Sequence, residues 1–224
     1  MSSSASGGPP GPPPAPVIQR HLSEPRLRPY LEACGEDLPR AVGLYRWNAR
    51  VAAAFWEVLG HGEVVLRNAI HDALTDRHRR NHSPGIWFDD PRGELAPQAH
   101  VEIAVARRRA GQVAAAALPG KIVAELPFGF WRYLLARRYS ATLWPALRHS
   151  FPHLRRGDRA RLERPVIRLH LLRNRIAHHE PLLRHDLDAR LVDLRAVFDS
   201  IDPRLTTWAL DDDGRLEELL AHRL

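Results

Sequence analysis

DRARLERPVIRLHLLRNRIAHHEP, residues 158–181, predicts one amphipathic helix that ends in a polar motif. Asp158 stands at its start and can cap the helix, because its carboxylate can accept hydrogen bonds from free amides of the first turn. Apolar residues recur at spacings of four, three and seven, at Leu162, Val166, Leu169 and Ile176. This spacing puts them along one side of a helix, which is therefore expected to face the core. The helix should finish near His178 or His179, because Pro181 disfavours helical geometry at the residue before it.

Helical patterns also cover most of the chain on either side of this stretch. Ser23, Asp37 and Asp186 are further candidate N-caps. The other expected helices span residues 23–33, 37–59, 63–78, 98–117, 121–126, 128–139, 141–151 and 186–198, with a short amphipathic helix within 207–224. His61 and Gly62 are expected to separate the second of these helices from the third. Because no convincing period-two alternation occurs, the predicted fold class is all-α.

Length and composition predict one folded domain with a tail at each end. The 224 residues suffice for a sizeable core, and 44% of them are hydrophobic. We expect a disordered Pro/Gly/Ser-rich tail over residues 1–20, a helical domain over 21–208 and a C-terminal tail with a short helix over 209–224. No stretch approaches about 18 uninterrupted apolar residues, and the first residues lack the regions of a secretory signal. We therefore expect no membrane span, and the single cysteine, Cys34, fits a cytoplasmic protein.

Positive charge gathers around the stretch quoted above. The chain has a formal net charge of +7, and nearly all of its cations are arginine, since Lys121 is the only lysine. Residues 131–190 hold 14 Arg and 5 acidic residues, a balance of +9, so the rest of the chain stands at −2. A basic patch is typical of proteins that bind phosphate-rich partners, although an arginine-rich surface can also be merely solvated.

Arg173 stands on the apolar side of the predicted helix, where the spacing asks for another apolar residue. A charge at such a position is costly to bury without a partner. Either the helix emerges into a cleft at this point, or Arg173 meets a carboxylate. Glu63, one helical turn before Arg67, is a candidate for that carboxylate. Arg175 lies elsewhere on the circumference and is expected to be solvated.

Asn174 and His178 are four residues apart and share one face of the helix. Arg173 and His178 are five apart, which is about 140° around an ideal helix, so a straight helix does not aim both at one atom. The two groups can meet at one phosphate only if the helix end is distorted or a second copy of the chain contributes. A helix C-terminus favours a protonated imidazole, which suits a general acid, but the role of His178 stays open between acid and base.

Two other interpretations of the motif stay open. It can be a helix end whose histidines complement the helix dipole and whose arginines make structural ion pairs. It can also bind a metal through His178, His179, Glu180 and His185, although adjacent histidines point apart on a helix and no H-E-x-x-H pattern occurs. Nucleotide-binding glycine loops, the G-x-S-x-G elbow and kinase signatures are absent, so no cofactor is expected.

Four segments together resemble Abi-like (abortive infection) proteins of the HEPN superfamily. Arg173-Asn174-x3-His178 is similar to the R-x4–6-H motif of that superfamily. The segments, in chain order, are Leu44-Tyr45-x-Trp47-Asn48, Glu63-Val64-x-Leu66-Arg67-Asn68-Ala69-Ile70, Lys121-Ile122-Val123-Ala124-Glu125-Leu126-Pro127-Phe128-Gly129-Phe130-Trp131 and Leu172-Arg173-Asn174-Arg175-Ile176-Ala177-His178-His179-Glu180-Pro181. The similarity covers about residues 22–208 and omits both ends.

The resemblance implies an HEPN-like helical bundle with additional helices, commonly dimeric, that acts in phage defence or as a toxin. In active members the Arg and His of two protomers face each other across the dimer cleft. Carried over, Arg173 and His178 become the catalytic pair, Asn174 the polar residue of the motif and Glu63 the acidic residue on an earlier helix. The residues that we expect to bind RNA are Arg67, Asn68, Arg175 and His179.

The implied function is metal-independent cleavage of RNA. A neutral histidine takes the proton of a 2′-hydroxyl, which attacks the adjacent phosphorus and leaves a 2′,3′-cyclic phosphate. Arginine stabilises charge on the phosphoryl oxygens in place of a metal. The expected partners are RNA, a second copy of the chain that completes a composite site, and an antitoxin. The alternatives are a catalytically inactive HEPN helical module that binds nucleic acid or a partner protein, and a structural helical dimer without a nucleic-acid role.

Overall fold

The computed structural model describes residues 14–83, 85–111, 118–155, 158–211 and 214–223, and these ranges contain helices and connecting turns but no β-strand. The predicted all-α fold class is confirmed. The α-helices are α1 (Ala15–Leu22), α2 (Glu24–Ala33), α3 (Leu38–Arg80), α4 (Pro97–Ala110), α5 (Leu118–Glu125), α6 (Phe128–Leu134), α7 (Trp144–Leu147), α8 (Arg159–Ala177), α9 (Leu187–Ile201), α10 (Pro203–Thr206) and α11 (Arg215–Ala221). Within the described ranges, no helix combines the length and apolar character that crossing a membrane requires.

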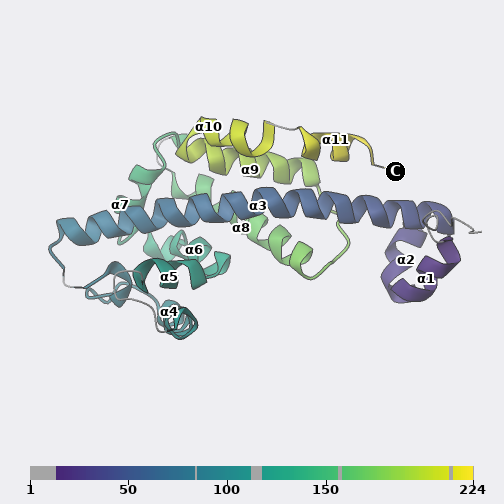
Figure 1. The fold of residues 1–224 in the computed structure, drawn as a ribbon. Helices are drawn as coiled ribbons and strands as arrows, with labels where there is room; N and C mark the ends of the chain where they lie inside the picture. Colours follow the sequence, from purple (N-terminus) through teal and green to yellow (C-terminus); the bar gives the residue numbers. More distant parts are fainter. Residues whose placement is uncertain (1–13, 84, 112–117, 156–157, 212–213, 224) are drawn as a thin grey trace, which may run out of the picture.

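The helix α3 is the spine of the molecule. It runs without interruption for 43 residues, which corresponds to about 65 Å. Figure 1 shows α1 and α2 below one end of α3, α4 to α6 below the other end, and α9 to α11 along its upper side. The helices that contact α3 are α1, α2, α6, α7, α8, α9 and α11.

The break that we expected in α3 at His61 and Gly62 is wrong. The helix continues through both residues, and neither Gly60 nor Gly62 has a positive φ. Gly62 is buried against α9, where an added Cβ would lie 3.7 Å from Phe198 Cζ and 3.8 Å from Leu194 Cδ2. Packing against α9 therefore holds this segment helical in spite of the low helix propensity of glycine.

Three of the four predicted N-caps are confirmed. Asp37, Asp158 and Asp186 each accept a hydrogen bond of 2.9 or 3.0 Å from a backbone amide in the first turn of α3, α8 and α9, respectively. Ser23 precedes α2 as expected, but its side chain makes no capping hydrogen bond and its φ is +71°. An aspartate side chain therefore caps the start of each of the three longest helices, α3, α8 and α9.

Several expected boundaries differ from the structure. The α1 helix begins at Ala15, inside the 1–20 segment that we expected to be disordered, while residues 1–13 lie outside the described ranges. The α4 helix ends at Ala110, because Gly111 has a φ of +65° and stops it, and residues 112–117 of the expected helix lie outside the described ranges. The helix that we expected over 141–151 is only the short α7, followed by a 3-10 turn at Arg148–Ser150. The α6 helix ends at Leu134, and a 3-10 turn follows at Arg137–Tyr139.

The C-terminal segment is attached to the body of the protein. Leu210 and Leu216 are buried, and α11 packs on α3. The indole Nε1 of Trp47 on α3 donates a hydrogen bond of 2.8 Å to the carbonyl of Leu219. The helix that we expected within 207–224 is present, therefore, and it covers part of the α3 surface.

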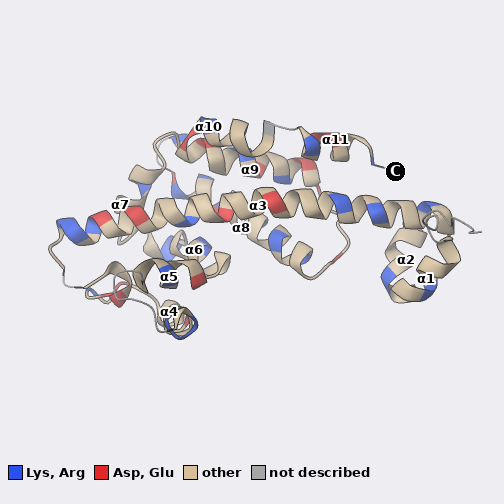
Figure 2. Cartoon of the chain, in the orientation of Figure 1, with Lys and Arg blue, Asp and Glu red and all other residues tan. Residues whose placement is uncertain are grey.

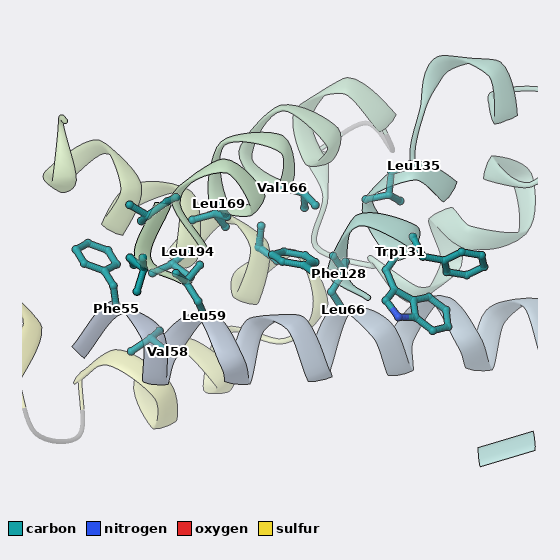
Figure 3. Close-up of a cluster of buried hydrophobic side chains, with 14 of the residues drawn as sticks. Phe55, Val58, Leu59, Leu66, Phe128, Trp131, Leu135, Val166, Leu169 and Leu194 are labelled. Atoms are coloured by element: carbon teal, nitrogen blue, oxygen red, sulfur yellow. The ribbon is translucent and has the colours of Figure 1, made fainter. Parts of the chain in front are cut away.

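Buried side chains of α3, α6, α8 and α9 meet in the core (Figure 3). The predicted apolar side of α8 is confirmed, since every member of it is buried: Leu162, Val166, Leu169 and Ile176. Trp131 of α6 is fully buried, as is Val166. Full burial of one aliphatic side chain contributes about 1.5–3 kcal/mol, so these contacts fix the position of α8 against α3 and α6.

The continuity of α3 predicts that alanine at either interior glycine stabilises the protein. Gly60→Ala and Gly62→Ala should each raise the free energy of unfolding by about 0.5–1 kcal/mol, because alanine restricts the unfolded chain and favours helix. Urea unfolding followed by circular dichroism measures the change.

Gly35→Ala is the matched control. Gly35 has a φ of +62° with no atom within 4 Å of an added Cβ, so the same substitution should cost about 1–2 kcal/mol there through backbone strain alone. Destabilisation by Gly60→Ala and Gly62→Ala of the size seen at Gly35 would show that α3 is broken in solution.

Candidate functional site

Arg173 of α8 has the carboxylate partner that its position demands. Its Nε lies 3.8 Å from Oε2 of Glu63 on α3, so the predicted partnership is confirmed. Its guanidinium also lies over the ring of Trp56, with Cζ 5.2 Å from the ring centroid. The Arg173 side chain is 35% exposed and that of Glu63 is 21% exposed. The cation therefore stands at the edge of the core, fixed on one side and reachable from solvent.

Glu63 links three helices. It faces Arg173 of α8 and accepts a hydrogen bond from the backbone amide of Phe128 at the start of α6. Burial raises the pKa of Glu63, while Arg173, Arg67 and the Phe128 amide act in the opposite direction. Burial outweighs these contacts, so the carboxylate is held in place at a cost in desolvation.

His170 belongs to the same cluster, although the sequence interpretation did not single it out. Its Nε2 lies 3.4 Å from Nδ2 of Asn174, one helical turn further along α8. Its ring meets the Phe128 ring edge to face, with centroids 5.6 Å apart. An added Cβ at Gly129 would lie 3.3 Å from Nε2, so the glycine leaves room for the imidazole. The spacing of His170 to Arg173 and Asn174, three and four residues, is the signal in the sequence that could have identified it.

Cations surround His170. Burial lowers the pKa of its imidazole, and Arg132 of α6 and Arg173 lower it further. The ring is therefore neutral around neutral pH, which is the state in which a histidine can accept a proton.

We call the residues around this carboxylate the Glu63 cluster: Glu63, Arg67, Arg132, His170, Arg173 and Asn174. Three arginines stand against one carboxylate, on helices that Figure 2 shows meeting below the middle of α3. In the described part of the chain, Nε of Arg67 and Nε of Arg132 are buried without a hydrogen-bond partner. The cluster thus has an excess of positive charge and unused guanidinium donors, which are the features that a phosphate group matches.

His178 is placed differently. It is the C-cap of α8, its amide donates to the carbonyl of Asn174 at 3.0 Å, and its side chain is exposed. The predicted end of the helix is therefore confirmed. Between the described residues of one chain, no hydrogen bond or ion pair joins the His178 ring to Arg173. One copy of the chain brings together Arg173, Asn174 and Glu63 but leaves His178 outside the cluster.

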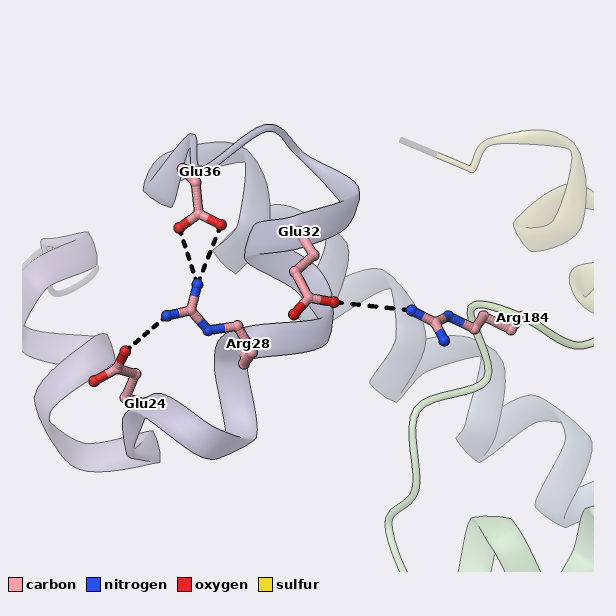
Figure 4. Close-up of polar contacts among 5 residues, drawn as sticks. All are labelled: Glu24, Arg28, Glu32, Glu36 and Arg184. Atoms are coloured by element: carbon pink, nitrogen blue, oxygen red, sulfur yellow. Dashed lines mark hydrogen bonds and ion pairs between the residues drawn. The ribbon is translucent and has the colours of Figure 1, made fainter.

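The segment that follows His178 is fastened to α2 and α3. The backbone amide of Leu182 donates a hydrogen bond of 2.8 Å to the buried Asn48 side chain of α3. The carbonyl of His179 accepts one of 2.6 Å from Arg26 of α2. Arg184 reaches toward Glu32 of α2 at 3.8 Å, as Figure 4 shows. These contacts set the direction in which α8 ends.

Three of the four predicted binding residues lie at the surface, and the fourth, Arg67, lies beside Glu63. Arg175 is exposed, as expected, and pairs with Glu180 at 2.6 Å. Asn68 and His179 are exposed, whereas Arg67 is half-buried beside Glu63. Arg67 is therefore the predicted binding residue that lies next to a predicted catalytic residue, Glu63.

An apolar groove of about 470 Å³ extends to Trp56, the residue over whose ring the Arg173 guanidinium lies. It lies between α2, α3 and the end of α8, and its lining includes Tyr30, Tyr45, Ala52, Trp56 and His179. Trp56 is 46% exposed, whereas Trp47, Trp131 and Trp144 are buried. Trp56 is therefore the tryptophan of these four whose ring a ligand can reach, and the Arg173 guanidinium lies over that ring.

Metal ligation finds no support in the described part of the chain, because no group of three His, Cys, Asp or Glu side chains is placed to hold an ion. The set His178, His179, Glu180 and His185 is described and does not form such a group.

Because the pKa of Glu63 is raised, its contribution to the free energy of unfolding should decrease as the pH rises. The folded state binds this proton more tightly than the unfolded state, so the contribution of Glu63 is full below its ordinary pKa of 4.5 and is lost as pH rises through the folded-state pKa. The free energy of unfolding of the wild type should therefore fall relative to that of Glu63→Gln as the pH rises above 4.5.

Glu94→Gln supplies the comparison with opposite sign. Arg77 donates two hydrogen bonds to Glu94, of 2.6 and 2.7 Å, and thereby lowers the pKa of Glu94. The contribution of Glu94 to the stability of the fold is therefore present above the ordinary pKa of the carboxyl group and is lost as the pH falls. Urea unfolding at several pH values measures both differences. Equal slopes for the two variants would contradict the assigned environment of Glu63.

Comparison of the chain with protein-family models, with curated proteins and with solved structures found no match.

Proposed function

We propose that this protein is a metal-independent endoribonuclease of the HEPN type that acts in phage defence by abortive infection or as a toxin. It cleaves RNA by attack of a 2′-hydroxyl on the adjacent phosphorus and leaves a 2′,3′-cyclic phosphate. Arg173 binds the phosphoryl oxygens, and His178 transfers a proton. The active site is completed in a homodimer, because His178 does not reach Arg173 within one chain.

The position of Arg173 is the observation that carries this proposal. A helix that needed only to pack would have an apolar residue there, and burying a charge instead is unfavourable. Glu63 and Trp56 hold the guanidinium at the edge of the core, and two further arginines with unpaired Nε atoms act on its neighbours, Arg67 on Glu63 and Arg132 on His170. Such a group stabilises a dianionic phosphorane by charge and by directed hydrogen bonds, which replaces the action of a metal.

The groove beside Arg173 supports RNA as the substrate. A single strand presents a phosphate and an unstacked base to a protein at the same time. Trp56 and the partly exposed Tyr45 of the groove offer aromatic surface for a base, and Arg173 offers charge for the phosphate next to it. Arginine-dominated contacts of this kind weaken steeply as salt concentration rises.

A non-catalytic HEPN module that binds nucleic acid is the second candidate. Its support is the exposed position of His178, which leaves the monomer with a phosphate grip but without the predicted acid or base of the motif. This candidate predicts RNA retention without cleavage, whereas a purely structural dimer predicts no RNA retention even at low salt.

The test is incubation of purified protein with total RNA in EDTA, followed by mapping of the RNA ends. We expect 2′,3′-cyclic phosphate ends, and we expect His178→Ala to slow their formation by about 10²- to 10⁴-fold while the helical content and dimerisation stay unchanged. Arg173→Gln should weaken both RNA binding and cleavage.

Arg79→Gln is the charge-matched control, because Arg79 is an exposed arginine in the last turn of α3. It should leave cleavage close to the wild-type rate. Cleavage by His178→Ala at the wild-type rate would remove His178 from the mechanism, and binding without any cleavage by the wild type would favour the non-catalytic module.

A further inference from the structure

We infer that His170 is the general base of the proposed cleavage and that Asn174 positions its imidazole ring. This inference rests on the proposed function and adds to it a residue outside the Arg-Asn-x3-His motif. It assigns the two proton transfers to two different histidines of the chain, one inside the Glu63 cluster and one at the end of α8.

The geometry of His170 is that of a held and accessible ring. Phe128 packs edge to face against it, and Gly129 approaches its Nε2 without a side chain. Asn174 Nδ2 lies 3.4 Å from Nε2, and an amide donates to Nε2 only when this nitrogen carries a lone pair and the ring proton is on Nδ1. The contact is long and therefore weak, so a substrate hydroxyl can replace it. Asn174 thus selects the tautomer that a base requires.

The charged groups that face His170 come from each of the three helices around it. Arg132 belongs to α6 and Arg173 to α8, and both disfavour a second positive charge on the ring. On α3, Glu63 faces Arg173, and Arg67 stands one turn beyond it. The single carboxylate is engaged by arginine and by the Phe128 amide, so it does not offset the cations at the imidazole. Together these groups keep His170 unprotonated and attract a phosphate beside it.

His178 suits the complementary step. It stands at the C-terminus of α8, and its side chain is exposed and lies outside the Glu63 cluster. His178 of a second copy of the chain can therefore approach the cluster from solvent and donate a proton to the leaving oxygen.

The proton balance of the reaction is complete with these two residues. Nε2 of His170 takes the proton of the 2′-hydroxyl while the 2′ oxygen forms its bond to phosphorus. The bond from phosphorus to the 5′ oxygen breaks, and that oxygen takes the proton of His178. The products are a 2′,3′-cyclic phosphate and a 5′-hydroxyl, and exchange of protons with water restores both histidines.

The test measures cleavage of a labelled RNA oligonucleotide by purified full-length protein in EDTA, as a function of pH. In the wild type, the acid limb of kcat/KM should have its midpoint below about 6.5, the ordinary pKa of histidine. His170→Gln should cleave RNA about 10²- to 10⁴-fold more slowly, and its kcat/KM should no longer show the acid limb. Its affinity for RNA should stay unchanged. His170→Ala should regain activity when imidazole is added, which a merely structural histidine would not show.

His185→Gln is the matched control. Burial and neighbouring arginines lower the pKa of His185 as well, but this residue lies just before α9 and outside the Glu63 cluster. It should keep the wild-type rate and pH profile. If the wild type cleaves and His170→Gln keeps its rate and profile, or if the wild-type midpoint lies at or above 6.5, the assignment of His170 is overturned while the proposed function stands. If the wild type leaves no cyclic-phosphate ends, the proposed function itself fails.

Discussion

The unbroken course of α3 is the constraint on which the rest of this structure depends. A helix of this length is stabilised by what it buries, and α3 buries side chains against elements from both halves of the chain. Glu63 stands in the middle of it, one residue after Gly62, which faces α9. A turn at this point would rotate Glu63 away from α8 and separate it from Arg173. The packing that keeps α3 straight therefore also assembles the Glu63 cluster.

Within the cluster, burial and charge oppose each other. The raised pKa of Glu63 and the lowered pKa of His170 are two results of the same partly desolvated, arginine-rich surroundings. A region selected only for stability would hold apolar residues or equal numbers of opposite charges. In the proposed function, a bound phosphate compensates the charge of the unbalanced arginines. The groove at Trp56 then offers aromatic surface next to that phosphate.

Local features of the sequence predicted local features of the structure. The apolar side of α8, its end at His178 and the aspartate caps depend on neighbours within a few residues, and all of them are present. The pairing of Arg173 with Glu63 was also predictable, because a charge on a buried face demands a partner. The sequence could not reveal that α9 holds Gly62 in a helix, since that contact joins residues more than 130 positions apart. Arg132 escaped prediction for the same reason, because its position depends on where α6 packs, whereas the spacing of His170 to Arg173 and Asn174 was a local signal that could have identified His170.

We propose that the Glu63 cluster holds a phosphodiester of RNA. A crystal structure of the protein with a 2′-O-methyl oligoribonucleotide, which cannot supply the attacking hydroxyl, is the sharpest test of this proposal. We expect a phosphate oxygen within about 3 Å of the Arg173 guanidinium, with Arg67 or Arg132 as a second donor and a base in the groove at Trp56. Phosphates bound only at other arginines, with Arg173 still paired to Glu63 and the groove vacant, would contradict it.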